Sequence, residues 1–267
     1  GIPYYQKSLD LLARQVAKQY NSLNQGFMVN QDGNYIKEDG SLLMLDGADG
    51  VPAPVSKTSG LTVQQRINLA NNTYGVYNKD GTQVLDENGV PLVDMEKFNQ
   101  WLEANGAYRP EGAGNLFSNR GDRDDDTDIT ASNITVSHSW SSRAVKVVPT
   151  HVQLFGEDGK PLPNTTQSEN INHMISMIDT KLVYDPKDLD PDAAGDNIFT
   201  GSFNDMLSNT CTVLGNDDRV TTTKLNNSYT TQVTIDTTRD GVSGVDLNDE
   251  AMNMMTYQKA YTAACRL

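Results

Sequence analysis

Apolar side chains recur at helical spacing near the C-terminus, at intervals of four and three residues. This spacing puts them on one face of a helix suited to coiled-coil packing. The face, called here the C-terminal seam, consists of Leu247, Ala251, Met254, Gln258, Tyr261 and Cys265. A turn at Ser243 and Gly244 precedes Asp246, whose carboxylate can accept backbone N–H bonds from the first helical turn. No stop signal precedes Leu267, so we expect this chain to be a piece of a longer polypeptide.

A second pattern of the same kind predicts a helix over residues 2–25. Pro3 suits a first helical turn, and Gly26 is typical of a C-terminal stop. Its apolar face consists of Ile2, Tyr5, Leu9, Leu12, Val16, Gln19 and Leu23. Because neither helix can bury its face alone, we expect the two ends of the chain to pack together as one helical bundle.

Residues 28–165 carry turn signals instead of a sustained helical pattern. Asp-Gly and Asn-Gly pairs favour hairpin turns, because these residues tolerate positive φ. The pairs begin at Asp32, Asp39, Asp46, Asp80, Asn88 and Asp158. Alternating apolar residues predict strands at 132–140 and 144–155.

Two short helices are predicted within this region. Thr62 and Gln65 have capping-box spacing at the start of residues 62–72, where Val63, Ile67 and Ala70 share one face. Asp94 opens the second helix, over 94–105, and Gly106 ends it. Its inward side chains are predicted to be Met95, Phe98 and Leu102.

Helical patterns return after residue 165. The first stripe is Ile171, Met174, Ile175, Ile178 and Leu182, and the second is Phe203, Met206, Leu207, Cys211 and Leu214. We expect the second helix to stop at Gly215. Residues 219–238 fit both a Thr-rich strand and a helix. The fold class is therefore α+β, with residues 1–27 and 166–267 forming the bundle and 28–165 a β-rich insertion.

Composition and charge narrow the range of partners. The chain has 267 residues, of which 37% are hydrophobic and 7% aromatic, and its formal net charge is −14. Such a charge repels phosphate backbones and anionic bilayers, so neither nucleic acid nor a membrane is expected as a partner. The sequence has no apolar run of the length, about 18 residues, that spans a bilayer, and its first residues do not resemble a secretory signal.

No catalytic or cofactor motif is found in the sequence. His138, His151 and His173 are scattered, and there is no HExxH pair, phosphate-binding loop or nucleophile elbow. His138 is expected to pack on the apolar face of a strand. Cys211 and Cys265 are expected to be buried thiols, with a disulfide as the alternative. We therefore do not predict an enzyme or a cofactor.

One acidic segment has oxygen ligands at a spacing that could hold calcium. Asp122, Asp124, Asp126 and Asp128 alternate within residues 121–128. Thr127, however, occupies the place of the turn glycine of an EF-hand, and the bidentate Glu is missing. A solvated acidic loop is the preferred interpretation, and calcium stays a weak alternative.

The C-terminal residues resemble bacterial flagellar axial proteins, and most closely the hook-associated protein 1 family. The matching residues are Ser243, Gly244, Val245, Leu247, Asp249, Glu250, Ala251, Tyr257, Gln258, Ala260 and Tyr261. Weaker likeness covers Leu9, Asp10, Ala13, Asn21 and Gly26, together with residues 129–134, 195–197 and 214–215. The sequence departs from the family pattern at Asn248, Met254, Met255 and Cys265.

The resemblance implies an extracellular structural subunit that joins the flagellar hook to the filament and is exported without a cleaved signal. Its implied partners are the hook protein, a second junction protein, further copies of itself and an export chaperone. Compared with this family, the chain lacks the N-terminal half and the final C-terminal helix, so we expect it to be monomeric. The resemblance also implies a long helix over 217–239. The alternatives are another flagellar axial protein (rod, hook or flagellin-like), or a secreted binding module or adhesin with ligand contact in the insertion.

Overall fold

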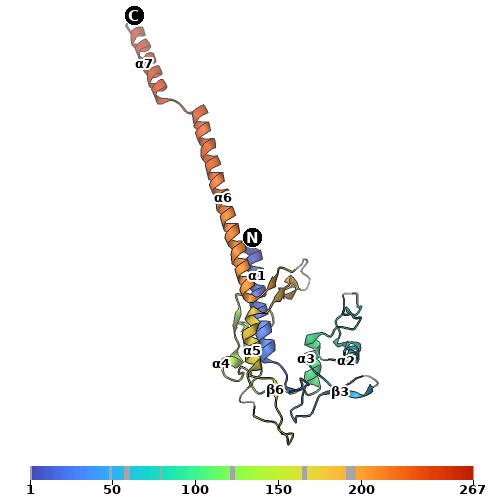
Figure 1. The fold of residues 1–267 in the computed structure, drawn as a ribbon. Helices are drawn as coiled ribbons and strands as arrows, with labels where there is room; N and C mark the ends of the chain where they lie inside the picture. The colour runs from blue at the N-terminus through green and yellow to red at the C-terminus, as the bar shows by residue number, and fades with distance from the viewer. Residues whose placement is uncertain are drawn as a thin grey trace. The chain divides into compact units, whose positions relative to one another are not determined.

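The computed structural model describes residues 2–47, 50–56, 61–78, 80–120, 124–163, 167–190 and 197–266. The chain divides into two compact units, Gly1–Ser208 and Asn209–Leu267. The α+β class is confirmed, since long helices occur together with small sheets (Figure 1). The predicted domain boundaries at residues 27 and 165 both fall inside the first unit and stay a prediction.

Helices contribute most of the regular structure. The α-helices are α1 (Ile2–Asn24), α2 (Val63–Leu69), α3 (Met95–Ala104), α4 (His138–Ser141), α5 (Glu169–Ser176), α6 (Phe203–Ser243) and α7 (Leu247–Ala264). A π-helical turn, η3 (Ala70–Tyr74), follows α2, and two 3-10 turns are η4 (Met177–Asp179) and η5 (Pro186–Asp188). The predicted helix at 2–25 is confirmed by α1, and the helix at 94–105 by α3.

The strands in the described residues form four separate two-stranded sheets. β1 (Val29–Asn30) pairs in parallel with β6 (Val152–Gln153). The antiparallel pairs are β2 (Met44–Asp46) with β3 (Pro52–Pro54), β4 (Phe117–Asn119) with β5 (Ile134–Val136), and β7 (Leu182–Tyr184) with β8 (Phe199–Gly201).

Three apolar clusters form the core of the first unit. The first packs α3 against residues 27–69 through side chains such as Phe27, Tyr35 and Phe98. The second places Leu11 of α1 against Tyr184 and Met206, so α1 packs on β7 and on the first turns of α6. The third is built on Leu116, Val145 and Met174. Within this unit, α1 therefore belongs to a helical assembly with α5 and the start of α6, as part of the bundle prediction required.

Five hairpins in the insertion share one turn geometry. In each, a glycine with positive φ donates its N–H to the carbonyl three residues earlier, as in Gly40 to Lys37 (2.9 Å) and Gly81 to Asn78 (3.0 Å). The five glycines are Gly33, Gly40, Gly81, Gly89 and Gly159. Isolated bridges such as Ile36 with Leu42 and Tyr77 with Gln83 close the hairpins. These turn predictions are confirmed. Asp46-Gly47 also lies where the chain leaves β2 for its antiparallel partner β3, and Gly47 N donates to Val51 O (2.9 Å), although Gly47 has no positive φ.

The two short helices of the insertion start where the sequence predicted. Gln65 N donates to Thr62 Oγ1 (3.2 Å) and Thr62 N donates to Gln65 Oε1 (3.1 Å), which completes the capping box of α2. Asp94 accepts N–H bonds from residues 96 and 97 at the start of α3. The inward-facing side chains of these helices were predicted less well, because Val63 of α2 is 52% exposed and Met95 of α3 is 48% exposed.

Both predicted long strands are wrong over much of their length. Ser137 caps α4 by accepting from Trp140 N, so residues 138–141 turn into a helix and His138 is exposed on it. Residues 144–150 form no ladder because their backbone bonds elsewhere. Lys146 O accepts from the Asn24 amide (3.0 Å), and Val148 N donates to the same side chain (2.8 Å). An alternating pattern could not show that the Asn24 side chain would take the hydrogen bonds that a neighbouring strand otherwise makes.

The predicted stop at Gly215 is also wrong, because α6 continues through it to Ser243. Residues 219–238 are helical, as the family resemblance implied and as their Thr content alone did not. Threonine hydroxyls there donate to the carbonyl four residues earlier, as in Thr231 to Asn227 (2.9 Å) and Thr234 to Thr230 (2.9 Å). The hydroxyls are thus satisfied on the helix itself, which removes their competition with the helical backbone bonds. The stripe at 171–182 also breaks up, since α5 ends at Ser176 and Leu182 begins β7.

Candidate functional site

The buried face of α1 is largely polar and holds distant loops by hydrogen bonds. Asn21 Nδ2 donates to Phe117 O (2.8 Å), and its Oδ1 accepts from the backbone N–H groups of Leu116 and Phe117 (2.9 Å each). Asn24 Nδ2 donates to Gly114 O (2.9 Å) and to Lys146 O. Two amides on successive turns thereby bond backbone groups of two separate chain segments.

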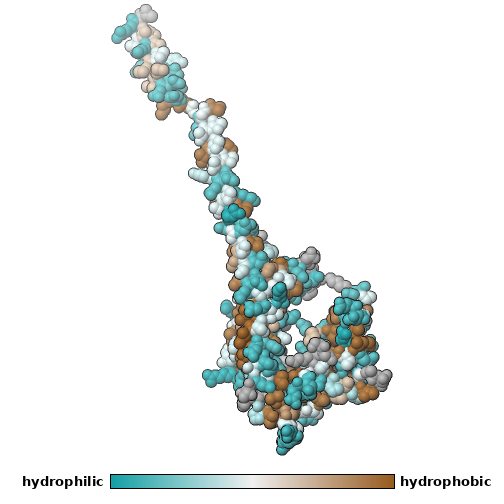
Figure 2. Space-filling view, viewed as in Figure 1, coloured by the Kyte–Doolittle hydropathy of each residue, from teal (hydrophilic) through white to brown (hydrophobic). Residues whose placement is uncertain are grey.

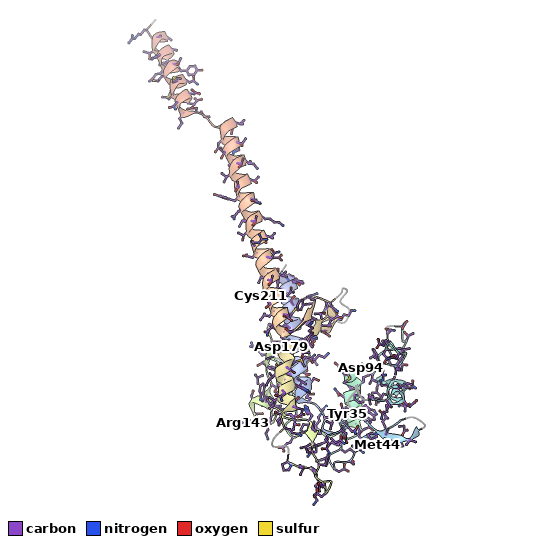
Figure 3. All side chains as sticks on the ribbon, viewed as in Figure 1. Tyr35, Met44, Asp94, Arg143, Asp179 and Cys211 are labelled. Carbon is purple, nitrogen blue, oxygen red and sulfur yellow. The ribbon has the colours of Figure 1, made fainter. Side chains whose placement is uncertain are left out.

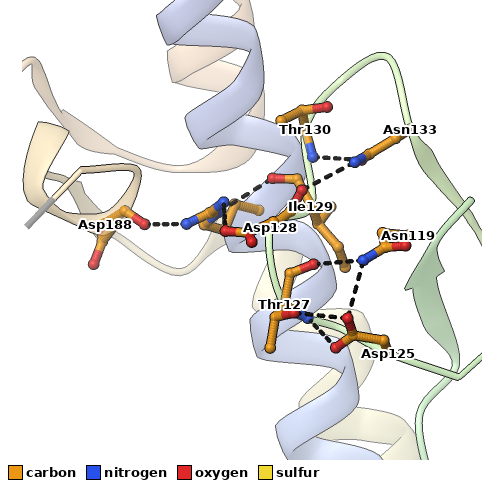
Figure 4. A network of polar contacts seen from close by, with 9 residues as sticks. Asn119, Asp125, Thr127, Asp128, Ile129, Thr130, Asn133 and Asp188 are labelled. Atoms are coloured by element: carbon orange, nitrogen blue, oxygen red, sulfur yellow. Dashed lines mark hydrogen bonds and ion pairs between the residues drawn. The ribbon is translucent and has the colours of Figure 1, made fainter. Parts of the chain in front are cut away.

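Arg14 extends this network from an earlier turn of α1 to Asp128, Ile129 and Asp188, which are labelled in Figure 4. Its guanidinium donates to the backbone carbonyl of Ile129 (3.1 Å) and to that of Asp188, and it lies 3.5 Å from the Asp128 carboxylate. Gln15 Nε2 donates to Asp188 Oδ2 (2.8 Å). These contacts hold residues 128–130 and η5 against α1, so the charged groups stabilise the fold.

The acidic segment that suggested calcium is bonded to protein donors. Asp122 lies outside the described residues. Asp124 accepts from the backbone N–H and hydroxyl of Ser139 (2.9 Å each), and Asp126 accepts from Asn21 Nδ2 (3.3 Å). In the part of the chain that the structure describes, no three acidic, His or Cys residues group as metal ligands. Calcium therefore gains no support from Asp124, Asp126 and Asp128.

A cleft of about 790 Å³ lies beside this network, between α1 and α3. One wall is a face of α1 that includes Lys18 and Ser22, and the other is a face of α3 that includes Asn99 and Gln100. Lys18 Nζ lies 3.8 Å from Glu96 Oε1, and both side chains are largely exposed. Two other lining residues pair with each other, since the Arg109 guanidinium lies 4.5 Å from the centre of the Phe27 ring, a cation–π distance. No sequence pattern predicted this cleft, because its walls come from segments that are far apart in the chain.

The predicted packing face of α1 is rotated relative to the face that is most buried. Leu12, Val16 and Leu23 are half-buried against the apolar clusters, and Tyr5 is half-buried, but Ile2 and Leu9 are exposed. The fully covered residues are Ser8, Leu11, Gln15, Ala17, Asn21 and Asn24. Hydrogen bonds allow the polar residues into the most buried positions, because Asn21 and Asn24 bond loop backbone, Gln15 bonds the Asp188 carboxylate and Ser8 bonds a carbonyl of α1 itself. An apolar pattern cannot detect such positions.

The C-terminal seam is exposed throughout α7, where Met254 is 66% and Tyr261 73% exposed. The seam residues Leu247, Ala251, Met254, Gln258, Tyr261 and Cys265 are all exposed in the second unit. Their packing against residues 2–23 stays a prediction. No described residue of the second unit covers this face. Figure 2 shows apolar side chains on the surfaces of α6 and α7, interspersed with polar ones. The pattern was read correctly as a helix, but it does not determine which surface covers that helix.

The turn between α6 and α7 agrees with the sequence. α6 ends at Ser243, whose hydroxyl donates to Arg239 O (2.8 Å), and Asp246 caps α7 by accepting from Asn248 N (2.8 Å). A Cβ at Gly244 would collide with the carbonyl of Asp240. Glycine is therefore needed where the first helix ends and the chain approaches its last turn.

Both cysteines are free and exposed, which corrects the prediction of buried thiols. Cys211 is labelled in Figure 3. Cys211 lies on α6 and Cys265 at the end of α7. Of the three histidines, His151 is buried whereas His138 and His173 are exposed. None of the described helices is both long and apolar enough to cross a membrane.

Comparisons with known proteins identify no relative. No family model, no curated protein and no solved structure matches this chain. Function is therefore argued from the residues and the geometry described above.

Proposed function

We propose that the chain belongs to a structural subunit of the bacterial flagellum, of the hook-associated protein 1 type, that joins hook to filament. The observation that carries this proposal is the turn that follows Ser243 and the capped helix α7 after it, which bear the residues that resemble the flagellar family. The subunit would act by assembling with copies of itself and with neighbouring axial proteins through helical surfaces.

Exposure of the C-terminal seam supports an assembly role. Leu247 is 83% exposed, Met254 66% and Tyr261 73%, although three such side chains on one helix face would gain from burial. A helix of this kind is stabilised when a second helix covers the seam. The exposed apolar residues Leu225, Tyr229 and Ile235 extend the same property along α6.

The net charge of −14 is consistent with such a subunit. Like charges on unassembled copies repel one another and keep them apart in dilute solution. Assembly then requires surfaces whose burial outweighs this repulsion, and salt should favour it by screening.

The test uses a strain of the source bacterium that lacks the full-length protein. We expect its cells to keep intact hooks and to release filament subunits into the medium. Intact, attached filaments in this strain would refute the proposal.

Complementation then tests the seam. Met254→Glu places a charge in the C-terminal seam, whereas Asn253→Glu adds the same charge one residue away, on a different face. We expect the Asn253 variant to restore filaments and the Met254 variant to fail, at equal amounts of exported protein. Equal rescue by both variants would show that the seam has no part in assembly.

A further inference from the structure

The cleft between α1 and α3 has the groups of a binding site that the fold itself does not use. Most polar side chains of the α1 network are bonded within the protein. On the cleft walls, by contrast, the side chains of Ser22, Asn99 and Gln100 make no hydrogen bond to any described residue. The buried Nε of Arg109 also lacks a hydrogen-bond partner among the described residues. Ser22 and Gln100 are exposed and Asn99 is half-buried, so these groups line one cavity with donors and acceptors that a ligand can reach.

The cleft lining carries charges of both signs, which disfavours a strongly charged ligand of either sign. Its lining has three cationic side chains, Arg14, Lys18 and Arg109, and four carboxylates. A phosphate or sulfate group would meet the carboxylates, and a polycation would meet the guanidinium groups. A neutral ligand avoids both penalties.

The free side chains favour a ligand that both donates and accepts hydrogen bonds. Each amide of Asn99 and Gln100 offers two donor hydrogens and an acceptor oxygen, and the Ser22 hydroxyl offers both functions. Sugar hydroxyls have the same dual character. The cavity volume of about 790 Å³ lies within the range of small-molecule sites.

A peptide fits this cleft less well than a saccharide. Recognition of an extended peptide uses a free strand edge or apolar pockets, and no strand belongs to the cleft lining. Phe27 and Tyr35 are only 5% and 8% exposed, so neither opens a pocket for a peptide side chain. Met95, which is 48% exposed, can cover the C–H face of a sugar ring.

We propose that the α1–α3 cleft binds a neutral saccharide, held by the amides of Asn99 and Gln100 on one side and by Ser22 and Lys18 on the other. This inference does not depend on the flagellar role, because the cleft lies entirely within the first unit. It adds a ligand to a chain whose proposed function is structural.

The experiment is an array of immobilised neutral, sialylated and sulfated glycans, together with a random peptide array, probed with the purified chain. We expect retention on neutral glycans alone. The best of them is then titrated by calorimetry against the wild type and the double variant Asn99→Ala/Gln100→Ala, with an expected loss of at least about tenfold in affinity. The matched control is Gln6→Ala/Asn172→Ala, two exposed amides outside the cleft, with unchanged affinity.

Folding of each variant is checked by its thermal transition. Retention on no glycan, only on charged glycans, or only on peptides would overturn the proposal, as would equal weakening of binding in the control variant. A second variant, Ser22→Ala, tests the opposite wall independently of α3. Saccharide binding that survives both the α3 and the Ser22 substitutions would also refute this site.

Discussion

Asn21 and Asn24 are buried amides whose hydrogen-bonding capacity is met by loop backbone. Each side chain donates to carbonyls and accepts from N–H groups that lie some 90 or more residues away in the sequence. Such bonds contribute little when formed, but a lost partner leaves buried backbone groups without compensation for their lost hydration. The loops at 114–117 and 146–148 thus depend on single side chains of α1.

We predict that Asn21→Ala lowers the free energy of unfolding of the first unit by about 2–4 kcal/mol, because it leaves two backbone N–H groups and one carbonyl without their hydrogen-bond partner. Urea unfolding followed by tryptophan fluorescence measures this, because Trp101 and Trp140 both lie in that unit. Gln6→Ala, at an exposed position of the same helix, should change it by less than about 0.5 kcal/mol. Equal effects of the two variants would contradict the role given to Asn21.

Carboxylates in the hairpin turns accept hydrogen bonds from residues two positions later in the sequence. The Ser41 hydroxyl donates to Asp39 Oδ1 (2.6 Å) and lowers the pKa of that carboxyl below 3.8, helped by the Ser41 N–H. Thr82 acts in the same way on the pKa of Asp80. Because the folded-state pKa values are lowered, this stability is present above pH 3.8 and is lost as pH falls through the folded values.

We predict that Ser41→Ala raises the pKa of Asp39 towards 3.8, because it removes the largest cause of the shift, and leaves the pKa of Asp80 unchanged. Carboxyl NMR titration from pH 6 to pH 2 measures both groups in one sample, with Asp80 as the internal reference. A parallel shift of both carboxyls would point to a general change of fold instead of the local hydroxyl bond.

Glycines in two kinds of element show how the same residue can serve opposite purposes. Gly81 has a φ of +82° in a hairpin turn, and a Cβ there would meet no atom within 4 Å. Gly215 lies in the interior of α6, and a Cβ there would also meet none. The two sites differ only in backbone conformation, since one requires the left-handed region and the other does not.

Alanine at these positions should therefore change stability with opposite signs. We expect Gly81→Ala to lower the free energy of unfolding by about 1 kcal/mol through backbone strain, and Gly215→Ala to stabilise α6 by about 0.5–1 kcal/mol. Fluorescence reports the hairpin variant through the first unit, and circular dichroism at 222 nm reports the helix variant. Effects of the same sign would refute this account of the two backbone sites.

At the level of the complete chain, the two units differ in how they are stabilised. The first has three apolar clusters and many long-range hydrogen bonds. In the second, all described residues from 214 to 266 except one are exposed, so intrahelical bonds are the main support. Helices without tertiary packing open readily, whereas a packed unit opens at a much higher cost.

Limited digestion with trypsin should reflect this difference. We predict that the first cuts follow Arg219, Lys224, Arg239 or Lys259, and that a fragment containing the first unit resists further digestion. Mass spectrometry of the early products identifies the sites, and tryptophan fluorescence of the resistant fragment should match that of the intact chain. First cuts within residues 2–208 would contradict the assignment of stability.

Local sequence signals predicted the elements whose causes are themselves local. The capping box at Thr62, the caps at Asp94 and Asp246, and the five hairpin turns with a positive-φ glycine depend on residues within four positions of one another. Periodicity predicted α1, α3 and α7 for the same reason, because residues three or four positions apart lie on the same face of a helix.

Contacts between distant segments decided the remainder. The loop path at 144–150 depends on Asn24, the buried face of α1 depends on hydrogen bonds to segments at 114–117 and 188, and the cleft exists because α1 and α3 face each other. The partner surface of the C-terminal seam is likewise not determined by the periodicity of residues 247–265. A periodic pattern shows that a helix face is suited to burial. Burial, however, requires a second surface, and the sequence of the helix does not describe that partner surface.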